Sequence, residues 1–409
     1  MEIQNIKTPL AVLGGGPAGY VAAIRAAQLG SHVVLIEEDA LGGVCMNRGC
    51  IPTKALLHSA SVAASISKAD EFGIDSSLGD IHWDFAIERK NRIVKNLNTS
   101  LEQLMEAKKI TVLSGQGELL TDRELIVHTE GGQIQVTFDK LILATGSAPV
   151  IPNIPGNQFP GVITSNEALD LTSIPETAVI IGAGIIGLEF AAMFRSAGCK
   201  VTVIDVIDRL LPSEDLDVSD ELTKILKRQG ITFRLGASVD CIEQMADGLS
   251  VQYNNARGKE ASATGEIVLL ATGRKPRSNF GLPFQLSEGA IVVDHHMETN
   301  IKGIYAAGDV IGGQLLAHLA YAEGRVAAEN ALGLSTTINY NAVPSCLYTN
   351  PEYATVGLNE QTAGQQGISI RVGKADFRTN GRAQTLGKRG GFVKVVAAED
   401  GTILGAQII

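Results

Sequence analysis

Two segments of the chain share one pattern of apolar strand, glycine-rich turn and helix. In the first, the apolar residues 8–13 end in the sequence GGGPAG, and the alanine-rich residues 20–29 that follow have helical periodicity. A second apolar run, 33–36, comes after Gly30 and ends at Glu37. This pattern predicts a strand–helix–strand unit of about thirty residues.

The same arrangement recurs at a constant offset of 168 residues, which separates Gly14 from Gly182 and Glu37 from Asp205. One G-x-G-x-x-G sequence alone is weak evidence for a ligand site. A strand before it, a helix after it and an acidic residue about 20 positions further on support a dinucleotide-binding fold. Two such units in phase predict two Rossmann-type domains, the alternative being glycines that serve only helix-to-strand packing.

The glycine turns predict the ligands as well as the fold. Glycine lets backbone N–H groups approach a pyrophosphate, and the helix N-terminus adds about half a positive charge. Glu37 and Asp205 would accept hydrogen bonds from ribose hydroxyls and would repel a 2′-phosphate. We therefore expect FAD at the first turn and NAD, rather than NADP, at the second. Arg209 either softens that preference or is a solvated surface residue.

The order of segments predicts how the domains are arranged. Apolar runs that end in Ala-Thr-Gly, 141–146 and 267–273, are expected to return to the two sheets, and the proline-rich residues 147–161 are typical of a linker. An apolar run at 301–310 and a helical stretch at 317–332 indicate that the second domain is inserted into the first. The expected α/β fold has an FAD-binding domain at 1–147, an NAD-binding domain at 148–272, a return to the first domain at 273–340 and an incomplete α+β interface domain at 341–409.

Composition and charge narrow the class of protein. The chain has 409 residues, 45% of them hydrophobic, and a formal net charge of −10. Nucleic-acid-binding proteins concentrate Lys and Arg, so nucleic acid is not expected as a partner. The five cysteines are odd in number and scattered, which favours the reducing cytoplasm over a secreted disulfide framework. The start of the chain shows no export signal, and no apolar run is long enough for a membrane-spanning helix.

The segment GGVCMNRGCIPTK holds a closely spaced cysteine pair, Cys45 and Cys50. Pro52 fits the first turn of a helix, which would place Cys50 near a helix N-terminus. The helix dipole, with Arg48 or Lys54, would lower the pKa of the thiol and favour a redox cysteine. The alternatives are two buried thiols or half of a zinc site, although no second Cys/His pair completes such a site, and we expect no metal.

These motifs together resemble the pyridine nucleotide-disulfide oxidoreductases. The resemblance extends to ATGRKP at 271–276, AAGDV at 306–310, LAHLAYAEG at 316–324 and YTNPEYATVG at 348–357, and it covers nearly the whole chain. GGVCMNRGCIPTK is most similar to the members of the family that oxidise dihydrolipoyl groups. Such members work as homodimers and serve lipoyl-bearing proteins of 2-oxoacid dehydrogenase or glycine cleavage complexes.

The resemblance implies an electron relay and assigns its residues. Substrate thiols would attack Cys45, Cys50 would be the thiolate in contact with the flavin, and the electrons would pass through FAD to NAD. Lys54 is similar to a lysine beside the flavin, with Glu189 as its ion-pair partner; the alternative is a solvated Lys54. The implied FAD-binding residues are Gly14, Gly16, Pro17, Ala18, Gly19, Glu37, Gly43, Lys54, Gly117, Thr145, Gly146, Asp309 and Ala317. The implied NAD-binding residues are Gly182, Gly184, Ile185, Ile186, Gly187, Asp205, Val239 and Gly273.

The chain departs from the family at its C-terminal histidine, the base that deprotonates the incoming thiol. Residues 319–409 contain no histidine, and the sequence stops within the apolar run TILGAQII. We therefore expect an incomplete third domain, impaired turnover of dihydrolipoamide and impaired dimerisation. His318 is either a substitute base or, as in relatives, a packing residue.

Other functions are compatible with the same motifs. A glutathione or mercuric reductase is the alternative within the family, although Asp205 and the CIPTK ending argue against the first. The absence of a second closely spaced cysteine pair argues against the mercuric enzyme. A nucleotide-binding protein that has lost catalysis is the alternative outside it.

Overall fold

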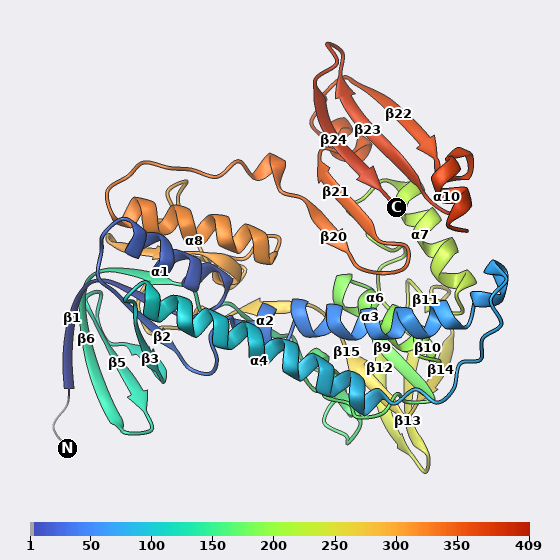
Figure 1. Ribbon diagram of the computed structural model, residues 1–409, viewed down its shortest axis with the longest axis horizontal. Coiled ribbons are helices and arrows are strands. Elements are labelled where there is room, and N and C mark those ends of the chain that lie inside the picture. Colours follow the sequence, from blue (N-terminus) through green and yellow to red (C-terminus); the bar gives the residue numbers. More distant parts are fainter. Residues whose placement is uncertain (1–3) are drawn as a thin grey trace. The chain divides into compact units, whose positions relative to one another are not determined.

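The computed structural model describes residues 4–409 of the chain; residues 1–3, part of the start for which no export signal is expected, lie outside the described residues. The described chain forms two compact units, each assembled from three segments. Unit 1 comprises the described residues up to Pro52, Lys90–Ala148 and Arg274–Ile338; unit 2 comprises Thr53–Arg89, Pro149–Gly273 and Asn339–Ile409. Figure 1 labels most of their elements.

A seven-stranded sheet forms the centre of unit 1, in the order β3-β2-β1-β6-β5-β4, with β19 paired to β6. β1 pairs in parallel with β2 and β6, and the chain order therefore reverses beside β1, where sheets of this topology bind dinucleotides. The bounds are β1 (Gln4–Leu13), β2 (Val33–Glu37), β3 (Thr111–Ser114), β4 (Gln116–Leu119), β5 (Glu124–Thr129), β6 (Gly132–Leu143) and β19 (Ile304–Ala306).

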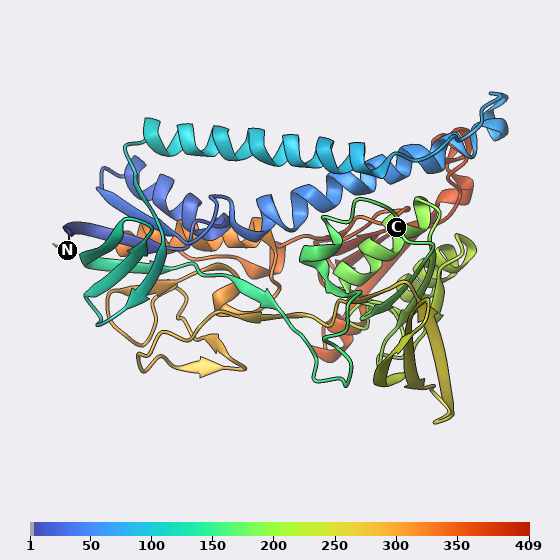
Figure 2. The same cartoon turned by 90° about the horizontal axis from the view of Figure 1, so that it is seen from below.

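Alternate residues of β1 pack on opposite faces of this sheet, as the two-residue period of a strand requires. Leu10 and Val12 share a core with the alanines of α1 (Pro17–Gln28) and α8 (Ala317–Ala331). Ala11 and Leu13 face the other core, which includes Ile291 of the hairpin β17 (Leu286–Ser287) and β18 (Ala290–Ile291). Figure 2 shows this hairpin (yellow) on the side of the sheet opposite α1.

The two helices α1 and α8 pack without space for larger residues. A Cβ atom at Gly324 of α8 would lie 2.1 Å from the carbonyl oxygen of Ala18. The other elements before residue 150 and in the last segment of unit 1 are α2 (Gly43–Asn47), α3 (Cys50–Ile66), η1 (Ala69–Phe72), α4 (Trp83–Ala107), β7 (Ser147–Pro149), β16 (Arg274–Pro276) and η2 (Gly308–Ile311). Helices α3 and α4 each contribute residues to both units.

Unit 2 contains a parallel sheet, in the order β11-β10-β9-β15-β8. Beside it lies the antiparallel sheet β12-β13-β14. The bounds are β8 (Val162–Thr164), α5 (Ser165–Ala168), β9 (Thr177–Ile181), α6 (Ile185–Ser196), β10 (Lys200–Ile204), α7 (Leu216–Arg228), β11 (Thr232–Arg234), β12 (Ser238–Met245), β13 (Gly248–Asn254), β14 (Glu260–Gly265) and β15 (Ile267–Leu270).

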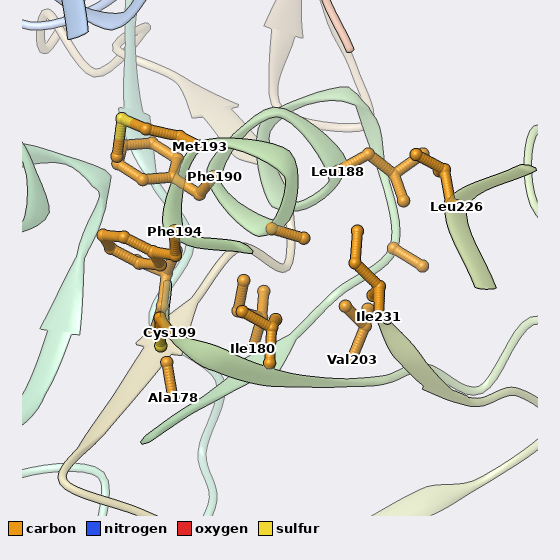
Figure 3. Close-up of a cluster of buried hydrophobic side chains, with 14 of the residues drawn as sticks. Ala178, Ile180, Leu188, Phe190, Met193, Phe194, Cys199, Val203, Leu226 and Ile231 are labelled. Atoms are coloured by element: carbon orange, nitrogen blue, oxygen red, sulfur yellow. The ribbon is translucent and has the colours of Figure 1, made fainter. Parts of the chain in front are cut away.

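The first strand of this sheet, β9, repeats the alternation of β1. Ala178 and Ile180 pack under α6 with Leu188 and Phe194, as Figure 3 shows. Val179 and Ile181 face the antiparallel sheet instead. The sheet of β1 and the sheet of β9 therefore each have a helical layer on one face and β structure on the other.

The last part of unit 2 is an antiparallel sheet in the order β20-β21-β24-β23-β22. Strand β24, formed by the TILGAQII segment, lies between β21 and β23. The bounds are η3 (Tyr340–Ala342), β20 (Ser345–Leu347), β21 (Tyr353–Gly357), α9 (Glu360–Gln365), β22 (Ile370–Asp376), η4 (Phe377–Thr379), α10 (Gly381–Thr385), β23 (Phe392–Ala398) and β24 (Ile403–Ile408).

A buried ion cluster ties this sheet to the start of α7. The side chain of Lys394 in β23 is 1% exposed, and its Nζ lies 2.9 Å from Asp215, 2.5 Å from Asp217 and 2.8 Å from Glu360. Burial alone would lower the pKa of Lys394, but the bonds to the three carboxylates raise it above its ordinary value. The lysine is therefore a cation in the folded protein, and it neutralises the buried Asp215.

Replacing this lysine is expected to destabilise unit 2. Lys394→Met would leave the buried carboxylate of Asp215 without a countercharge, so we expect the free energy of unfolding to fall by about 3–5 kcal/mol. Urea-induced unfolding measures the change. Lys374→Met is the control, because Lys374 is 42% exposed and pairs with Asp217 at the surface, where a pair contributes about 1 kcal/mol or less. Equal losses in the two variants would contradict the expectation.

The predicted α/β fold with two Rossmann-type sheets is confirmed, with differences at the ends of elements. The helix expected from residue 20 begins at Pro17, because proline and glycine are tolerated in a first turn whose N–H groups have no helical partner. The strand expected over 267–273 ends at Leu270. Helix α4 and the β4–β5 hairpin were not predicted.

Candidate functional site

The first glycine turn joins β1 to α1 at the carboxyl edge of the sheet of unit 1. Gly14 has a φ of +104°, and a Cβ atom there would lie 2.3 Å from the carbonyl oxygen of Ala144. A Cβ at Gly19 would lie 1.8 Å from the carbonyl oxygen of Gly14. At Gly16, the N-cap of α1, a Cβ would meet only the Cα of Gly43 at 3.7 Å, and no side chain caps the helix. The outer glycines therefore serve packing, and the middle one keeps the helix N-terminus open.

The second glycine turn, between β9 and α6, has the same geometry. A Cβ at Gly182, where φ is +114°, would lie 2.2 Å from the carbonyl oxygen of Ala271, and one at Gly187 would lie 2.0 Å from that of Gly182. At Gly184 a Cβ would meet no atom within 4 Å. Ile185 and Ile186 form the first turn of α6, which again has no side-chain cap. Both turns thus have the open, donor-rich shape that a pyrophosphate requires.

The two acidic residues brace these turns. Glu37 accepts hydrogen bonds from the backbone N–H groups of Gly15 (2.6 Å) and Asp39 (2.9 Å). Asp205 does the same for Ala183 (2.5 Å) and Ile207 (3.1 Å). Burial raises the pKa of Glu37, and the bond from Gly15 opposes that shift. The ribose contacts expected from the sequence require further lone pairs on these carboxylates, and each oxygen can accept a second bond.

Several other residues predicted to contact FAD lie around the first turn, within unit 1. Ala18 packs against Gly308, whose Cβ would lie 3.0 Å from that of Ala18, and Asp309 follows in η2. Gly117 of β4 abuts Leu13, since a Cβ there would lie 2.5 Å from its Cδ1. Pro17 and Ala317 are the first residues of α1 and α8, and a Cβ at Gly14 would lie 3.1 Å from the backbone nitrogen of Thr145, which Gly146 follows.

Asp309 belongs to a polar chain that the sequence did not reveal. Ser147 donates a hydrogen bond to the Oδ2 of Asp309 (2.5 Å), and the Nε of Arg274 donates to the hydroxyl of Ser147 (2.8 Å). Burial lowers the pKa of Arg274, and the charge of Asp309 opposes that shift. Arg274 lies within the ATGRKP motif, which was the only signal available from the sequence.

The two cysteines share one electrostatic environment. Cys45 lies in the short helix α2 and Cys50 is the first residue of α3, as predicted, and both are half-buried. Tyr20 of α1 and Tyr321 of α8 have ring centroids 5.8 Å apart. Burial raises the pKa of each tyrosine, and the charges of both cysteines raise it further. Cys45 and Cys50 therefore interact electrostatically with this tyrosine pair, which was not predicted.

The predicted ion pair between Lys54 and Glu189 is present within unit 2. The Nζ of Lys54 lies 2.8 Å from both carboxylate oxygens of Glu189, which is 4% exposed. The backbone N–H of Tyr348 donates to the same carboxylate (3.1 Å), and its ring lies 4.5 Å from Nζ. Lys54 follows Cys50 by about one turn of α3.

Removing Lys54 is expected to cost stability. Lys54→Met would leave the buried Glu189 carboxylate without its cation, and we expect the free energy of unfolding to fall by about 1–3 kcal/mol. Denaturant titration measures this loss, and Lys68→Met, at an exposed position after α3, serves as the control. The double variant Lys54→Met/Glu189→Gln should recover part of the loss. No recovery would mean that the pair is not the cause.

The residues predicted to bind NAD lie at one edge of unit 2. Val239 packs on the core that contains the strand-end residues Ile181, Ile204 and Leu270. Gly273, with a φ of +106°, follows Leu270 and accepts a hydrogen bond from the backbone of Val150. These positions share the carboxyl edge of the parallel sheet with the second glycine turn.

The side chain of Arg209 is hydrogen-bonded to other residues of unit 2 and is not only solvated. Its guanidinium donates to the carbonyl oxygens of Glu214 (2.9 Å) and Pro212 (2.6 Å) and to the side chain of Gln361 (2.9 Å). Both terminal nitrogens therefore have acceptors inside the protein.

Comparison with known proteins agrees with this geometry. The family described as pyridine nucleotide-disulphide oxidoreductase matches residues 8–324, and the dimerisation domain of the same family matches residues 343–409. The chain belongs to this family. It is an oxidoreductase, and the family's cofactors are FAD and NAD(H), which the two open glycine turns fit.

Curated relatives of the family cover almost the whole chain. A dihydrolipoyl dehydrogenase of Bacillus subtilis is 38% identical over 98% of this chain and 88% of its own length. One of Chlamydia muridarum is 41% identical over 97% of this chain and 86% of its own length. The resemblance inferred from the motifs is therefore confirmed.

Two solved structures are similar in fold. LpdA of Mycobacterium tuberculosis has a TM-score of 0.89 at 27% identity and covers 99% of this chain and 90% of its own. The HOCl-induced flavoprotein disulfide reductase RclA of Escherichia coli has a TM-score of 0.86 at 30% identity, covering 98% of this chain and 89% of its own.

In the part of the chain that the structure describes, no helix is long and apolar enough to cross a membrane.

Proposed function

We propose that this chain oxidises protein-bound dihydrolipoyl groups and reduces NAD⁺, with Cys45 and Cys50 as its dithiol–disulfide couple. The observation that carries the proposal is the cysteine pair, with Cys45 in α2 and Cys50 at the start of α3, in the same unit as a glycine turn of dinucleotide-binding shape. Dihydrolipoyl dehydrogenases among the curated relatives support this substrate over other dithiols.

The residues that would hold the two cofactors follow from the site. For FAD we assign the first glycine turn, Glu37, Gly43, Gly117, Thr145, Gly146, Asp309 and Ala317, with Lys54 beside the ring. For NAD we assign the second turn, Asp205, Val239 and Gly273. When bound, FAD would accept the two electrons that the reduced Cys45–Cys50 pair gives up as its disulfide re-forms, and it would supply them to NAD⁺ as a hydride.

The cysteines carry the thiol chemistry. One thiolate of the dihydrolipoyl group attacks the Sγ of Cys45 in the Cys45–Cys50 disulfide, forms a mixed disulfide and releases Cys50 as a thiolate. The second substrate thiolate then attacks the substrate sulfur that is bonded to Cys45 in the mixed disulfide, and Cys45 leaves as a thiolate. The substrate leaves as the cyclic disulfide, and the two cysteines hold its two electrons. Overall, the dithiol and NAD⁺ give the disulfide, NADH and one proton.

The position of Cys50 suits its assigned role. As the first residue of α3 it lies where the helix dipole stabilises an anion, so the leaving thiolate is favoured. Lys54 and its partner Glu189 lie one turn further along the chain. We assign this pair to positioning a cation next to the flavin when it is bound.

The second turn is assigned to NAD rather than NADP. Asp205 would repel a 2′-phosphate, and Arg209 is engaged by Pro212, Glu214 and Gln361. An arginine with internal acceptors at both terminal nitrogens gives up hydrogen bonds if it turns to a phosphate. These bonds differ from both expectations for Arg209, which were a residue that softens the preference for NAD and a solvated surface residue.

The remaining assignments belong to the same proposal. The FAD-binding domain would comprise residues 1–147 and 273–340. The NAD-binding domain would comprise residues 148–272, and residues 341–409 would form the dimer interface. The partner would be a lipoyl-bearing protein of a 2-oxoacid dehydrogenase or glycine cleavage complex in the cytoplasm.

Two half-reactions test the function separately. Under anaerobic conditions, NADH is added to the FAD-loaded protein and the absorbance spectrum is followed; we expect bleaching near 450 nm and alkylatable Cys45 and Cys50 after two electrons. Dihydrolipoamide and NAD⁺ are then supplied, and NADH formation is followed at 340 nm. Reduction by NADPH and glutathione disulfide instead would support a different disulfide reductase. A yellow protein that NADH does not bleach would contradict the proposal.

A further inference from the structure

The segment that carries the cysteines is held by one asparagine between them. Asn47 closes helix α2, and its Nδ2 donates hydrogen bonds to the carbonyl oxygens of Gly43 (2.9 Å) and Leu41 (3.0 Å). The neighbouring Gly42 donates its N–H to the carbonyl oxygen of Gly15 in the first glycine turn (2.8 Å). The amide of Asn47 therefore fixes the path of the chain between the cofactor turn and Cys45.

The orientation of that amide depends on a residue from a distant part of the sequence. The Nδ2 of Asn98, in the part of α4 that belongs to unit 1, donates to the Oδ1 of Asn47 (2.8 Å). This bond directs the oxygen of Asn47 toward α4 and its nitrogen toward the carbonyls of the cysteine segment. If the amide turned over, its oxygen would face carbonyl oxygens, and the segment would lose its donors.

The environment of Asn98 gives an independent reason to assign it a role. Its own Oδ1 is buried and has no hydrogen-bond partner among the described residues. A buried acceptor without a partner destabilises a protein, and an apolar residue of similar shape would avoid that loss. Fold stability therefore does not account for an amide at this position, whereas orienting Asn47 does.

We propose that Asn98 is a positioning residue for the Cys45–Cys50 couple, acting through Asn47. The inference rests on the proposed function, because it requires that these cysteines form a reversible disulfide. Without Asn98 the cysteine segment is free to adopt a second arrangement, and the equilibrium between the dithiol and the disulfide shifts.

The experiment uses the full-length, FAD-loaded protein in glutathione redox buffers. After acid quenching and alkylation, mass spectrometry gives the fractions of reduced and disulfide-bonded Cys45–Cys50 peptide. Asn98→Leu removes both polar groups, and Asn98→Asp keeps the shape but has no N–H donor at neutral pH. Asn96→Leu, at an exposed position on the same helix, is the control. Thermal unfolding is recorded for every variant.

We expect both Asn98 variants to change the thiol–disulfide equilibrium constant about fivefold or more, the effect of one net hydrogen bond. Asn96→Leu should leave it unchanged, and Asn98→Leu should unfold at the wild-type temperature or above. In the double variant Asn47→Ala/Asn98→Leu, the second change should add nothing to the first, because Asn98 acts through Asn47.

Other results would overturn the inference in distinguishable ways. An equilibrium constant within twofold of the wild type in both Asn98 variants removes the positioning role, and a lowered unfolding temperature with an unchanged constant assigns Asn98 to stability alone. Additive effects in the double variant remove the route through Asn47. If the wild-type protein forms no Cys45–Cys50 disulfide in any buffer, the proposed function fails, and the inference fails with it.

Discussion

Cys45→Ser and Cys50→Ser are each expected to abolish NADH formation from dihydrolipoamide, with a fall in kcat of at least about 10³-fold. Serine oxygen cannot form the disulfide that receives the two electrons, so neither the attack on Cys45 nor the release of Cys50 can occur. The measurement is steady-state NADH production at 340 nm with dihydrolipoamide and NAD⁺ in excess. The two variants should be equally inactive, because each removes one half of the same couple.

The control for this prediction must separate thiol chemistry from cofactor binding. Both variants should retain FAD and should still reduce ferricyanide with NADH, since that reaction needs no disulfide. Cys241→Ser replaces a half-buried cysteine in β12 and should keep wild-type turnover. Dihydrolipoamide turnover above a tenth of wild type in either variant would contradict the assigned relay.

Gly184→Ala and Gly187→Ala are expected to fail in different ways although both lie in one turn. A Cβ at Gly184 meets no protein atom within 4 Å, so the protein should fold normally while the methyl group occupies the space in front of α6. We expect the affinity for NADH to fall at least about tenfold, because the pyrophosphate can no longer approach the helix N-terminus closely. Fluorescence titration with NADH measures the change.

At Gly187 the added methyl group would meet the protein itself. Its Cβ would lie 2.0 Å from the carbonyl oxygen of Gly182, so α6 must move away from β9 and we expect a clear loss of thermal stability together with NADH binding. Gly364→Ala is the matched control for Gly184→Ala. A Cβ at Gly364 likewise meets no atom within 4 Å, but Gly364 lies in α9, away from the glycine turn. If Gly184→Ala binds NADH like the wild type, the second turn is not the NAD site.

The sequence revealed those parts of the site that follow one another along the chain. The glycine turns, Glu37, Asp205 and the position of Cys50 at the start of a helix could be predicted, because each depends on spacing within one strand–helix–strand unit. The braces that these carboxylates provide could not, since a backbone N–H carries no sequence signal.

Contacts between distant segments were missed for a different reason. Asp309 with Ser147 and Arg274, Tyr20 with Tyr321, and Asn47 with Asn98 are pairs that only tertiary packing brings together. Helix α4 was missed as an element, although it supplies Asn98. Lys54 and Glu189 could be paired only by family resemblance, since 135 residues separate them.

The loop after β10 follows a strand of the parallel sheet and is hydrogen-bonded to the C-terminal sheet region. Asp205 stands at its beginning, and Arg209, Ser213 and Asp215 are bonded to Gln361, Asn359 and Lys394 of the C-terminal sheet region. We therefore expect a ligand that binds to Asp205 to affect the residues of this loop that anchor α9 and β23. Slower amide hydrogen exchange in α9 after NADH binds would record this mechanical link, so that the C-terminal sheet reports on occupancy of a nucleotide pocket to which it contributes no assigned residue.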